Sequence, residues 1–178
     1  MASNCYLAYD EKTKEAVVID PGEEADYIES IIADLGIVPK FILVTHGHSD
    51  HTLAVSELKL AYRIPLLMSN LDGFLLRKLL YARAIPPQID KNITDNDEIR
   101  LGSLIIKAVA IGGHTPGSLA YFCNNRVFTG DALFADGTIG RYDFNYADKE
   151  ILIRSIAKLK KLAKGMRVYP GHGEEFML

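Results

Sequence analysis

Five histidines are the residues of this sequence best suited to chemistry, and each follows a strand-like stretch directly in a polar or glycine-rich segment. They are His46, His48, His51, His114 and His172. Loops at the carboxyl ends of strands are where α/β sheets place their ligands. The sequence has no histidine outside this pattern. The pattern therefore predicts that the histidines serve a binding site.

The densest group of these residues lies in the segment THGHSDH, residues 45–51. His46 and His48, separated by one residue, can point the same way from an extended segment and share one ion. Asp50 and His51 open the next expected helix and can face a second ion. A lone histidine is usually only solvated, and Asp50 by itself could cap a helix. Three histidines and an aspartate within six residues favour a metal site, and a set without thiolate suits zinc, iron or manganese.

Three later segments carry the remaining candidates. His114 lies in GGHTPGS, Asp131 ends the segment FTGD, and His172 lies in YPGHG. Each segment alone is more typical of an ordinary turn. A carboxylate directly after a strand and a glycine, as at Asp131, is well placed to bridge two ions.

The elements that must position these segments follow from the apolar pattern. The expected strands are residues 4–9, 15–19, 41–44, 64–68, 98–101, 104–110, 119–123, 126–128 and 166–169. The expected helices are residues 25–35, 51–62, 70–81 and 148–164. Strands with interspersed helices in two halves indicate sheet layers covered by helices. Periodicity alone does not separate one sheet from two.

Length and composition predict one globular domain over residues 1–178. Apolar residues make up 48% and charged residues 24%, with a net charge of −3. No block of like charge indicates nucleic-acid binding. No apolar run reaches the ~20 residues that span a bilayer, and no secretory signal is visible. We therefore expect no nucleic-acid or membrane partner and a cytoplasmic location, with Cys5 and Cys123 as buried small hydrophobic residues.

In this order the four segments resemble the metallo-β-lactamase superfamily, from Asn4 to His172. The His-x-His-x-Asp-His signature is the most specific part. The resemblance implies an α/β fold, a four-layer αβ/βα sandwich with two mixed sheets and the site at one edge between them. It implies a first metal held by His46, His48 and His114, a second held by Asp50, His51 and His172, and Asp131 as the bridge.

Within that superfamily the chain is similar to the small glyoxalase II (hydroxyacylglutathione hydrolase) branch. The similar segments are NCYL at 4–7, IDPG at 19–22, FTGDALF at 128–134 and IGRYDF at 139–144. Full-length enzymes of that branch carry a helical C-terminal domain that supplies part of the glutathione site. This chain ends six residues after His172, so we expect that domain to be absent.

The resemblance implies a metal-dependent hydrolase that cleaves a small-molecule thioester of the hydroxyacylglutathione type. Two divalent ions, zinc foremost with iron or manganese as options, would lower the pKa of a shared water towards about 7 and supply hydroxide. Asp50 would act in catalysis by holding the direction of this nucleophile. Arg141 would bind a substrate carboxylate, and Tyr142 or Tyr146 would flank the acyl group. Asp20 and Thr45 would orient the ligand histidines.

Other functions remain open. A persulfide dioxygenase of the same superfamily would use one iron on His46, His114 and Asp131, and a lactone or ester hydrolase would use the same two-metal site. A nuclease or phosphodiesterase of the superfamily would need a basic groove or an added nucleic-acid domain, which the acidic composition and short length do not offer. A metal-binding protein without activity is disfavoured by the full set of ligands. The sequence predicts no oligomeric state.

Overall fold

The first of two mixed β-sheets contains the N-terminal strands. The computed structural model describes residues 3–78 and 86–178, and the sheet order is β1-β2-β3-β4-β5. Its strands are β1 (Tyr6–Tyr9), β2 (Glu15–Ile19), β3 (Val38–Leu43), β4 (Leu66–Met68) and β5 (Lys91–Asn92). Among the described strands of this sheet, only β1 and β2 form an antiparallel pair. Strands β2 and β3 therefore end at the same edge.

The second sheet is built from the rest of the chain, in the order β11-β10-β9-β8-β7-β6. Its strands are β6 (Glu98–Leu101), β7 (Leu104–Ala110), β8 (Leu119–Cys123), β9 (Arg126–Gly130), β10 (Arg167–Pro170) and β11 (Phe176–Met177). In the part of this sheet that the structure describes, only β9 and β10 run parallel. In this sheet too, two neighbouring strands end side by side.

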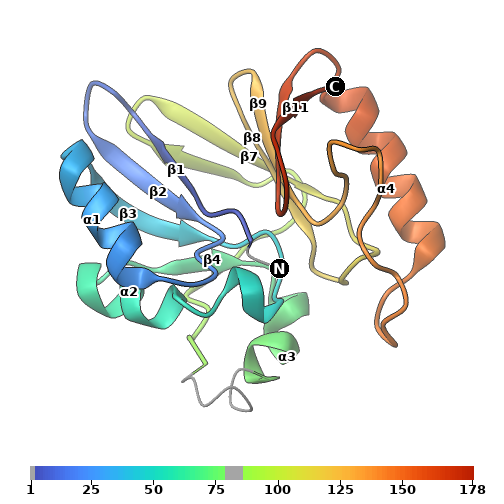
Figure 1. The fold of residues 1–178 in the computed structure, drawn as a ribbon, viewed down its shortest axis with the longest axis horizontal. Coiled ribbons are helices and arrows are strands. Elements are labelled where there is room, and N and C mark those ends of the chain that lie inside the picture. Colours follow the sequence, from blue (N-terminus) through green and yellow to red (C-terminus); the bar gives the residue numbers. More distant parts are fainter. Residues whose placement is uncertain (1–2, 79–85) are drawn as a thin grey trace.

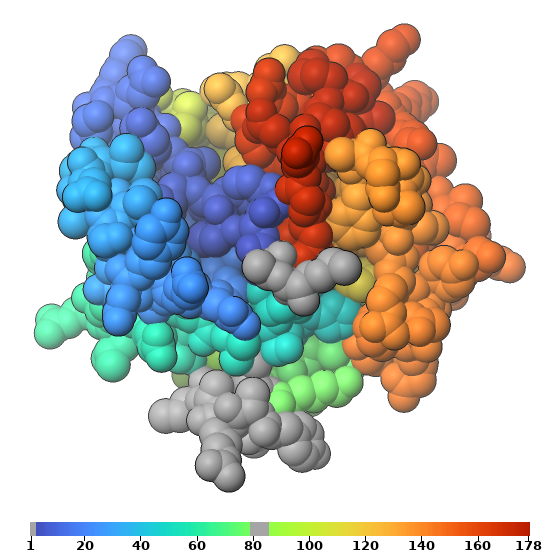
Figure 2. Space-filling view, viewed as in Figure 1, coloured from blue at the N-terminus to red at the C-terminus, as the bar shows by residue number. Residues whose placement is uncertain are grey.

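Helices cover the outer face of each sheet, which gives four layers. Helices α1 (Ala25–Leu35) and α2 (Val55–Tyr62) lie on the first sheet, and α4 (Lys149–Leu162) lies on the second (Figure 1). The space-filling view shows the two halves as adjoining parts of one surface, blue to cyan beside orange to red (Figure 2). The expected αβ/βα sandwich with two mixed sheets is confirmed.

The alternation of side chains along β2 shows why the layers form. Ala16 and Val18 face α1 and α2 and join the outer core with Ile28 and Ile32. Val17 and Ile19 point the other way, into the core between the sheets. Successive residues of a strand face opposite sides, so one strand supplies two cores. Burying a valine or isoleucine side chain stabilises the fold by about 1.5–3 kcal/mol.

The outer core of the second sheet depends on the helical spacing of α4. Leu152, Ile156 and Leu159 lie on one face and pack with Val127 and Val168. Residues three and four apart share a helix face. Asp148 caps the helix by accepting a hydrogen bond from Ile151 N at 2.9 Å, as its residue type favours.

The expected helix from residue 51 to 62 starts later than predicted. Ser49–His51 forms a short 3₁₀ turn, and α2 begins only at Val55. The amide of Ala54 donates to Pro21 O at 3.2 Å, so this segment bonds to another part of the chain. That long-range bond cannot be read from local periodicity.

Two strands are absent from the expected set, and one expected helix is shorter. Strands β5 and β11 have two residues each and exist through their pairing with β4 and β10. The helix expected over residues 70–81 is a 3₁₀ turn, Asn70–Asp72, followed by α3 (Gly73–Leu76). Residues 79–81 of that expectation lie outside the described residues. None of the described helices is long and apolar enough to cross a membrane.

Asp10 joins the two sheets at the edge away from the ends of β2 and β3. Its carboxylate accepts hydrogen bonds from the amide and hydroxyl of Ser103, both at 2.6 Å, and from Lys12 N at 2.8 Å. The hydroxyl bond from Ser103, then its amide and that of Lys12, hold the pKa of Asp10 well below its usual range. The charged carboxylate is therefore the stabilising form.

We predict that Asp10→Ala unfolds at a lower urea concentration than the unchanged protein at pH 7. The contribution of Asp10 is complete above its unfolded-state pKa of about 3.9 and is lost as the pH falls towards the lower folded-state pKa. The gap between the urea concentrations at which the variant and the unchanged protein unfold should therefore narrow from pH 7 to pH 3. Glu11→Ala, which removes an exposed neighbouring carboxylate, is the control. A gap that does not change with pH would show that the charge of Asp10 is irrelevant.

Candidate metal centre

The four predicted segments meet at the edge where β3, β9 and β10 end. The histidines of residues 46–51 follow β3, Asp131 follows β9 directly, and His172 follows β10. His114 lies in the turn that joins β7 to β8. Backbone bonds hold these segments together, because Leu119 N donates to Thr45 O at 2.8 Å and Gly171 N donates to Gly130 O at 2.8 Å.

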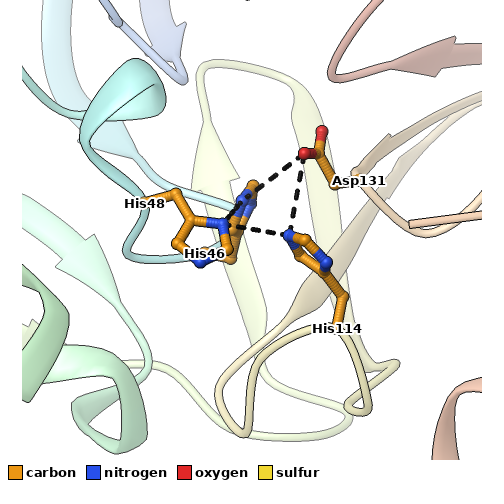
Figure 3. A group of neighbouring side chains, drawn as sticks. All are labelled: His46, His48, His114 and Asp131. Atoms are coloured by element: carbon orange, nitrogen blue, oxygen red, sulfur yellow. Dashed lines mark hydrogen bonds and ion pairs between the residues drawn. The ribbon is translucent and has the colours of Figure 1, made fainter. Parts of the chain in front are cut away.

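The first group of candidate ligands comprises three histidines and one carboxylate. Figure 3 shows His46, His48, His114 and Asp131 turned toward one another. His48 Nδ1 lies 3.0 Å from both His46 Nε2 and His114 Nε2. Asp131 Oδ2 lies 3.9 Å from His46 Nε2 and 3.7 Å from His114 Nε2. Two imidazoles thus offer Nε2, whereas His48 offers Nδ1.

The second group comprises Asp50, His51 and His172. Asp50 Oδ2 lies 3.3 Å from His172 Nε2 and 3.8 Å from His51 Nε2. Asp131 borders this group as well, with Oδ1 at 3.4 Å from His51 Nε2 and Oδ2 at 3.4 Å from His172 Nε2. All seven residues predicted as ligands are therefore brought together, with Asp131 between the two groups.

These distances fit two bound cations. When ligand atoms surround a tetrahedral zinc ion at about 2.0–2.1 Å, they stand roughly 3.3 Å from one another. The candidate ligand atoms lie 3.0–3.9 Å apart, a range that includes this separation. Among the described side chains, His51 Nε2 and Asp131 Oδ1 are the two buried polar atoms without a hydrogen bond. Unpaired buried polar atoms are costly, and a cation between them would satisfy both.

The protonation of the site also suits a cation. Burial, then the charge of nearby imidazoles, lowers the pKa of His46 well below 6.5 and that of His48 to about 4. These rings are neutral at pH 7 and keep a lone pair for a metal. Burial acts to raise the pKa of Asp131, but His172 and His51 hold it well below its usual range.

His51 differs from the other imidazoles. Burial acts to lower its pKa, but the carboxylates of Asp131 and Asp20 outweigh burial and raise the pKa to about 10. Two carboxylates facing one ring thus favour positive charge at this point. A metal cation bound at Nε2 satisfies the same carboxylates as a proton does.

Asp20 and Thr45 lie behind the ligand histidines, as expected. Asp20 Oδ2 lies 3.1 Å from His51 Nδ1 and accepts a hydrogen bond from Thr45 Oγ1 at 2.6 Å. Thr45 Oγ1 also lies 3.1 Å from His46 Nδ1. Asp20 has a φ of 52°, a left-handed conformation that is rare outside glycine and that Asp tolerates better than most residues. Its carboxylate fixes the ring orientation of His51.

Gly171 is required by the close packing beneath the second group. A Cβ at this position would overlap Asp131 Oδ1 and lie 2.8 Å from His51 Cε1. The backbone of the loop that carries His172 therefore approaches the carboxylate of Asp131 to a distance that only glycine allows.

A cleft of about 980 Å³ opens over both groups, lined by His48, Asp50, Phe134, Arg141 and Tyr146 among others. Arg141 is exposed and makes two hydrogen bonds to Asp143, at 2.9 and 2.8 Å. Its guanidinium also lies over the ring of Phe144 at 4.5 Å. Tyr142 does not line the cleft, and its ring lies beneath Lys149 Nζ at 4.9 Å. The substrate roles of Arg141 and Tyr142 stay predictions.

Asp72 is a buried residue of the site that the sequence analysis did not single out. Its Oδ2 accepts from Gly47 N at 2.9 Å and from Thr115 Oγ1 at 2.7 Å, and its Oδ1 accepts from Gly117 N at 2.7 Å. It therefore links the loop of His46 and His48 to the loop of His114. Burial raises its pKa. The sequence did contain a signal for Asp72, because like the candidate ligands it is a polar residue shortly after a strand.

The fold and the two ligand groups together define the class of this protein. A four-layer sandwich with histidines and aspartates at one edge between its sheets is the architecture expected of a metallo-β-lactamase. Residues 1–172 match the family model described as Metallo-beta-lactamase superfamily. The chain belongs to this superfamily.

Three similar proteins illustrate the relationship. Hydroxyacylglutathione hydrolase GloC of Haemophilus influenzae is 37% identical over 182 residues, which cover 96% of this chain and 85% of that protein. The structure of BLEG-1 B3 metallo-beta-lactamase has a TM-score of 0.89 at 30% identity, covering 98% of this chain and 88% of that chain. The di-iron-bound form of TTHA1623 has a TM-score of 0.86 at 34% identity, covering 98% and 89%.

We predict that Asp72→Asn lowers the free energy of unfolding by about 1–3 kcal/mol, because one backbone amide would then face an amide donor instead of an oxygen. Urea denaturation measures the change. Asp34→Asn, at an exposed position of α1, is the control. Unchanged stability in Asp72→Asn would show that the three hydrogen bonds do not depend on a carboxylate.

Proposed function

We propose that this protein is a two-metal hydrolase that cleaves a thioester of the hydroxyacylglutathione type. One observation carries the proposal: two ligand groups share Asp131 at the floor of a single cleft. His46, His48 and His114 would hold one divalent cation, and Asp50, His51 and His172 the other. Zinc is the first candidate for a set of imidazoles and carboxylates.

Bound divalent cations supply an activated water and polarise a carbonyl oxygen. The chain's own residues prepare this chemistry. His46 and His48 are held neutral by burial, and Asp131 is held ionised by His172 and His51. Asp50 is half-buried and lines the cleft, so its carboxylate can accept a hydrogen bond from an attacking water and orient it.

The residues that line the cleft support the thioester class. Arg141 is the only basic residue besides histidine among the described residues that line the cleft, and its guanidinium is bonded to Asp143. A strong general acid is not evident there. A thiolate leaves without one, whereas an amine does not. The similarity to a hydroxyacylglutathione hydrolase supports the same class.

The completeness of the second group weighs against a mononuclear dioxygenase. That chemistry would need only His46, His114 and Asp131. Here Asp50, His51 and His172 also lie within ligand distance of one another, and Asp131 Oδ1 faces His51 rather than the first group. This arrangement favours hydrolysis at two cations.

We predict about two equivalents of divalent metal per chain after purification without chelator. S-lactoylglutathione should be hydrolysed, and chelation should abolish the activity because the cations activate the water. Metal analysis and release of free thiol measure these two quantities. Restoring zinc should restore the rate.

Other results would contradict the proposal. About one equivalent of iron, no thiol release and oxygen uptake with glutathione persulfide would favour the dioxygenase. Two equivalents of metal with cleavage of lactones or oxygen esters alone would keep the hydrolase and reject the thioester.

We predict that Asp50→Asn lowers kcat by about 10²-fold or more, because an amide is a poor acceptor for the attacking water and a poor ligand. Zinc content should fall from two equivalents towards one. Steady-state kinetics and metal analysis of the purified variant measure both effects. Asp34→Asn is the matched control on the outside of α1. Full activity in Asp50→Asn would remove Asp50 from the mechanism.

A further inference from the structure

The loop that borders the cleft also holds two ligand histidines from behind. This segment, residues 134–146, is called the cleft loop below. His114 Nδ1 donates to Arg141 O at 2.8 Å, and His48 Nε2 lies 2.8 Å from the hydroxyl of Tyr146. Both histidines belong to the first ligand group. The geometry of that group therefore depends on the cleft loop.

The direction of the His48–Tyr146 bond follows from the position of the ring. His48 Nδ1 faces His46 Nε2 and His114 Nε2 at 3.0 Å, so Nδ1 is the nitrogen that would bind a cation. A neutral imidazole that uses Nδ1 as a ligand carries its proton on Nε2. Nε2–H then donates to the phenol oxygen of Tyr146.

Tyr146 is fixed in place by other aromatic rings. Its ring stacks on Phe144 with centroids 5.2 Å apart and 7° between the planes. Phe74 of α3 meets it edge-on at 5.3 Å, and Lys78 Nζ lies over it at 4.8 Å. These contacts hold the hydroxyl at its position before any ligand binds. A preorganised acceptor of this kind selects one tautomer and one orientation of His48.

We propose that Tyr146 is a positioning residue for the first cation, acting through His48. Its hydroxyl oxygen keeps Nδ1 of His48 directed at the ligand group and so raises the affinity of that position for a divalent cation. This inference rests on the metal centre of the proposed function and does not depend on the thioester substrate.

The second ligand group provides an internal comparison. The outer nitrogen of His51 is held by Asp20, which follows β2, and not by the cleft loop. Loss of the Tyr146 hydroxyl should therefore weaken one cation position and leave the other unchanged. A general loss of stability would not separate the two positions in this way.

The test is Tyr146→Phe, which keeps the aromatic ring and removes the oxygen. Purified protein is titrated with Zn²⁺ in competition with a chromophoric chelator, without any substrate. We expect one of the two ions, the one at the first position, to be held about 10–100-fold less tightly and the affinity for the other ion to stay the same. Tyr27→Phe removes a hydroxyl from an exposed ring of α1 and is the control. Wild-type affinity for both ions in Tyr146→Phe would overturn the proposal.

A second variant separates the hydroxyl from the packing of the ring. Phe74→Leu removes the edge-on partner of Tyr146 and keeps the oxygen, so its zinc affinity should change less than that of Tyr146→Phe. A larger loss in Phe74→Leu would assign the effect to packing and reject the role of the hydroxyl. In the zinc-loaded protein, the downfield proton resonance of His48 Nε2–H should exchange with water faster in Tyr146→Phe. Failure of thioester cleavage would not alter either result, since neither measurement uses a thioester.

Discussion

The burial of Asp131 among imidazoles is the constraint on which the rest of the site depends. A carboxylate taken out of water is unfavourable unless positive or donor groups meet it. Asp131 lies within 4.0 Å of His46, His51, His114 and His172, yet its Oδ1 has no hydrogen bond. The arrangement is best satisfied by cations on both sides of this residue. Three other loops, which carry His46 and His51, His114 and His172, must therefore converge on this one side chain.

The two halves of the chain divide the ligands between them. The half built on the first sheet supplies His46, His48, Asp50 and His51, and the half built on the second supplies His114, Asp131 and His172. The ligand distances are therefore set by the packing of the two sheets. Asp72 and Asp10 fasten this packing, one beside the ligand loops and one at the other edge. Because the proposed cations would contact residues of both halves, metal binding should also stabilise the fold.

Local pattern predicted much of this structure. Strands β2, β6, β7 and β8 begin and end where the apolar pattern placed them, because each has at least one face in a core. The seven candidate ligands could be singled out because residues of the right types follow strands. The atoms and hydrogen-bond partners that the site uses could not be predicted in this way. The use of Nδ1 by His48, the bonds of Asp72 and the acceptor role of Tyr146 depend on residues 25 to 98 positions apart in the sequence. No periodicity encodes such long-range partners.

The histidines of the two cation positions are held by different parts of the fold, and this difference has a thermodynamic consequence. The second position is anchored to β2 through Asp20, whereas the first is anchored to the cleft loop through Arg141 O and Tyr146. A ligand that orders the cleft loop would therefore favour the orientation of His48 and His114 that binds a cation. Coupling of this kind is reciprocal, so the first cation would in turn favour the loop conformation that binds substrate. The same hydrogen bonds that shape the metal site thereby connect its occupancy to the cleft above it.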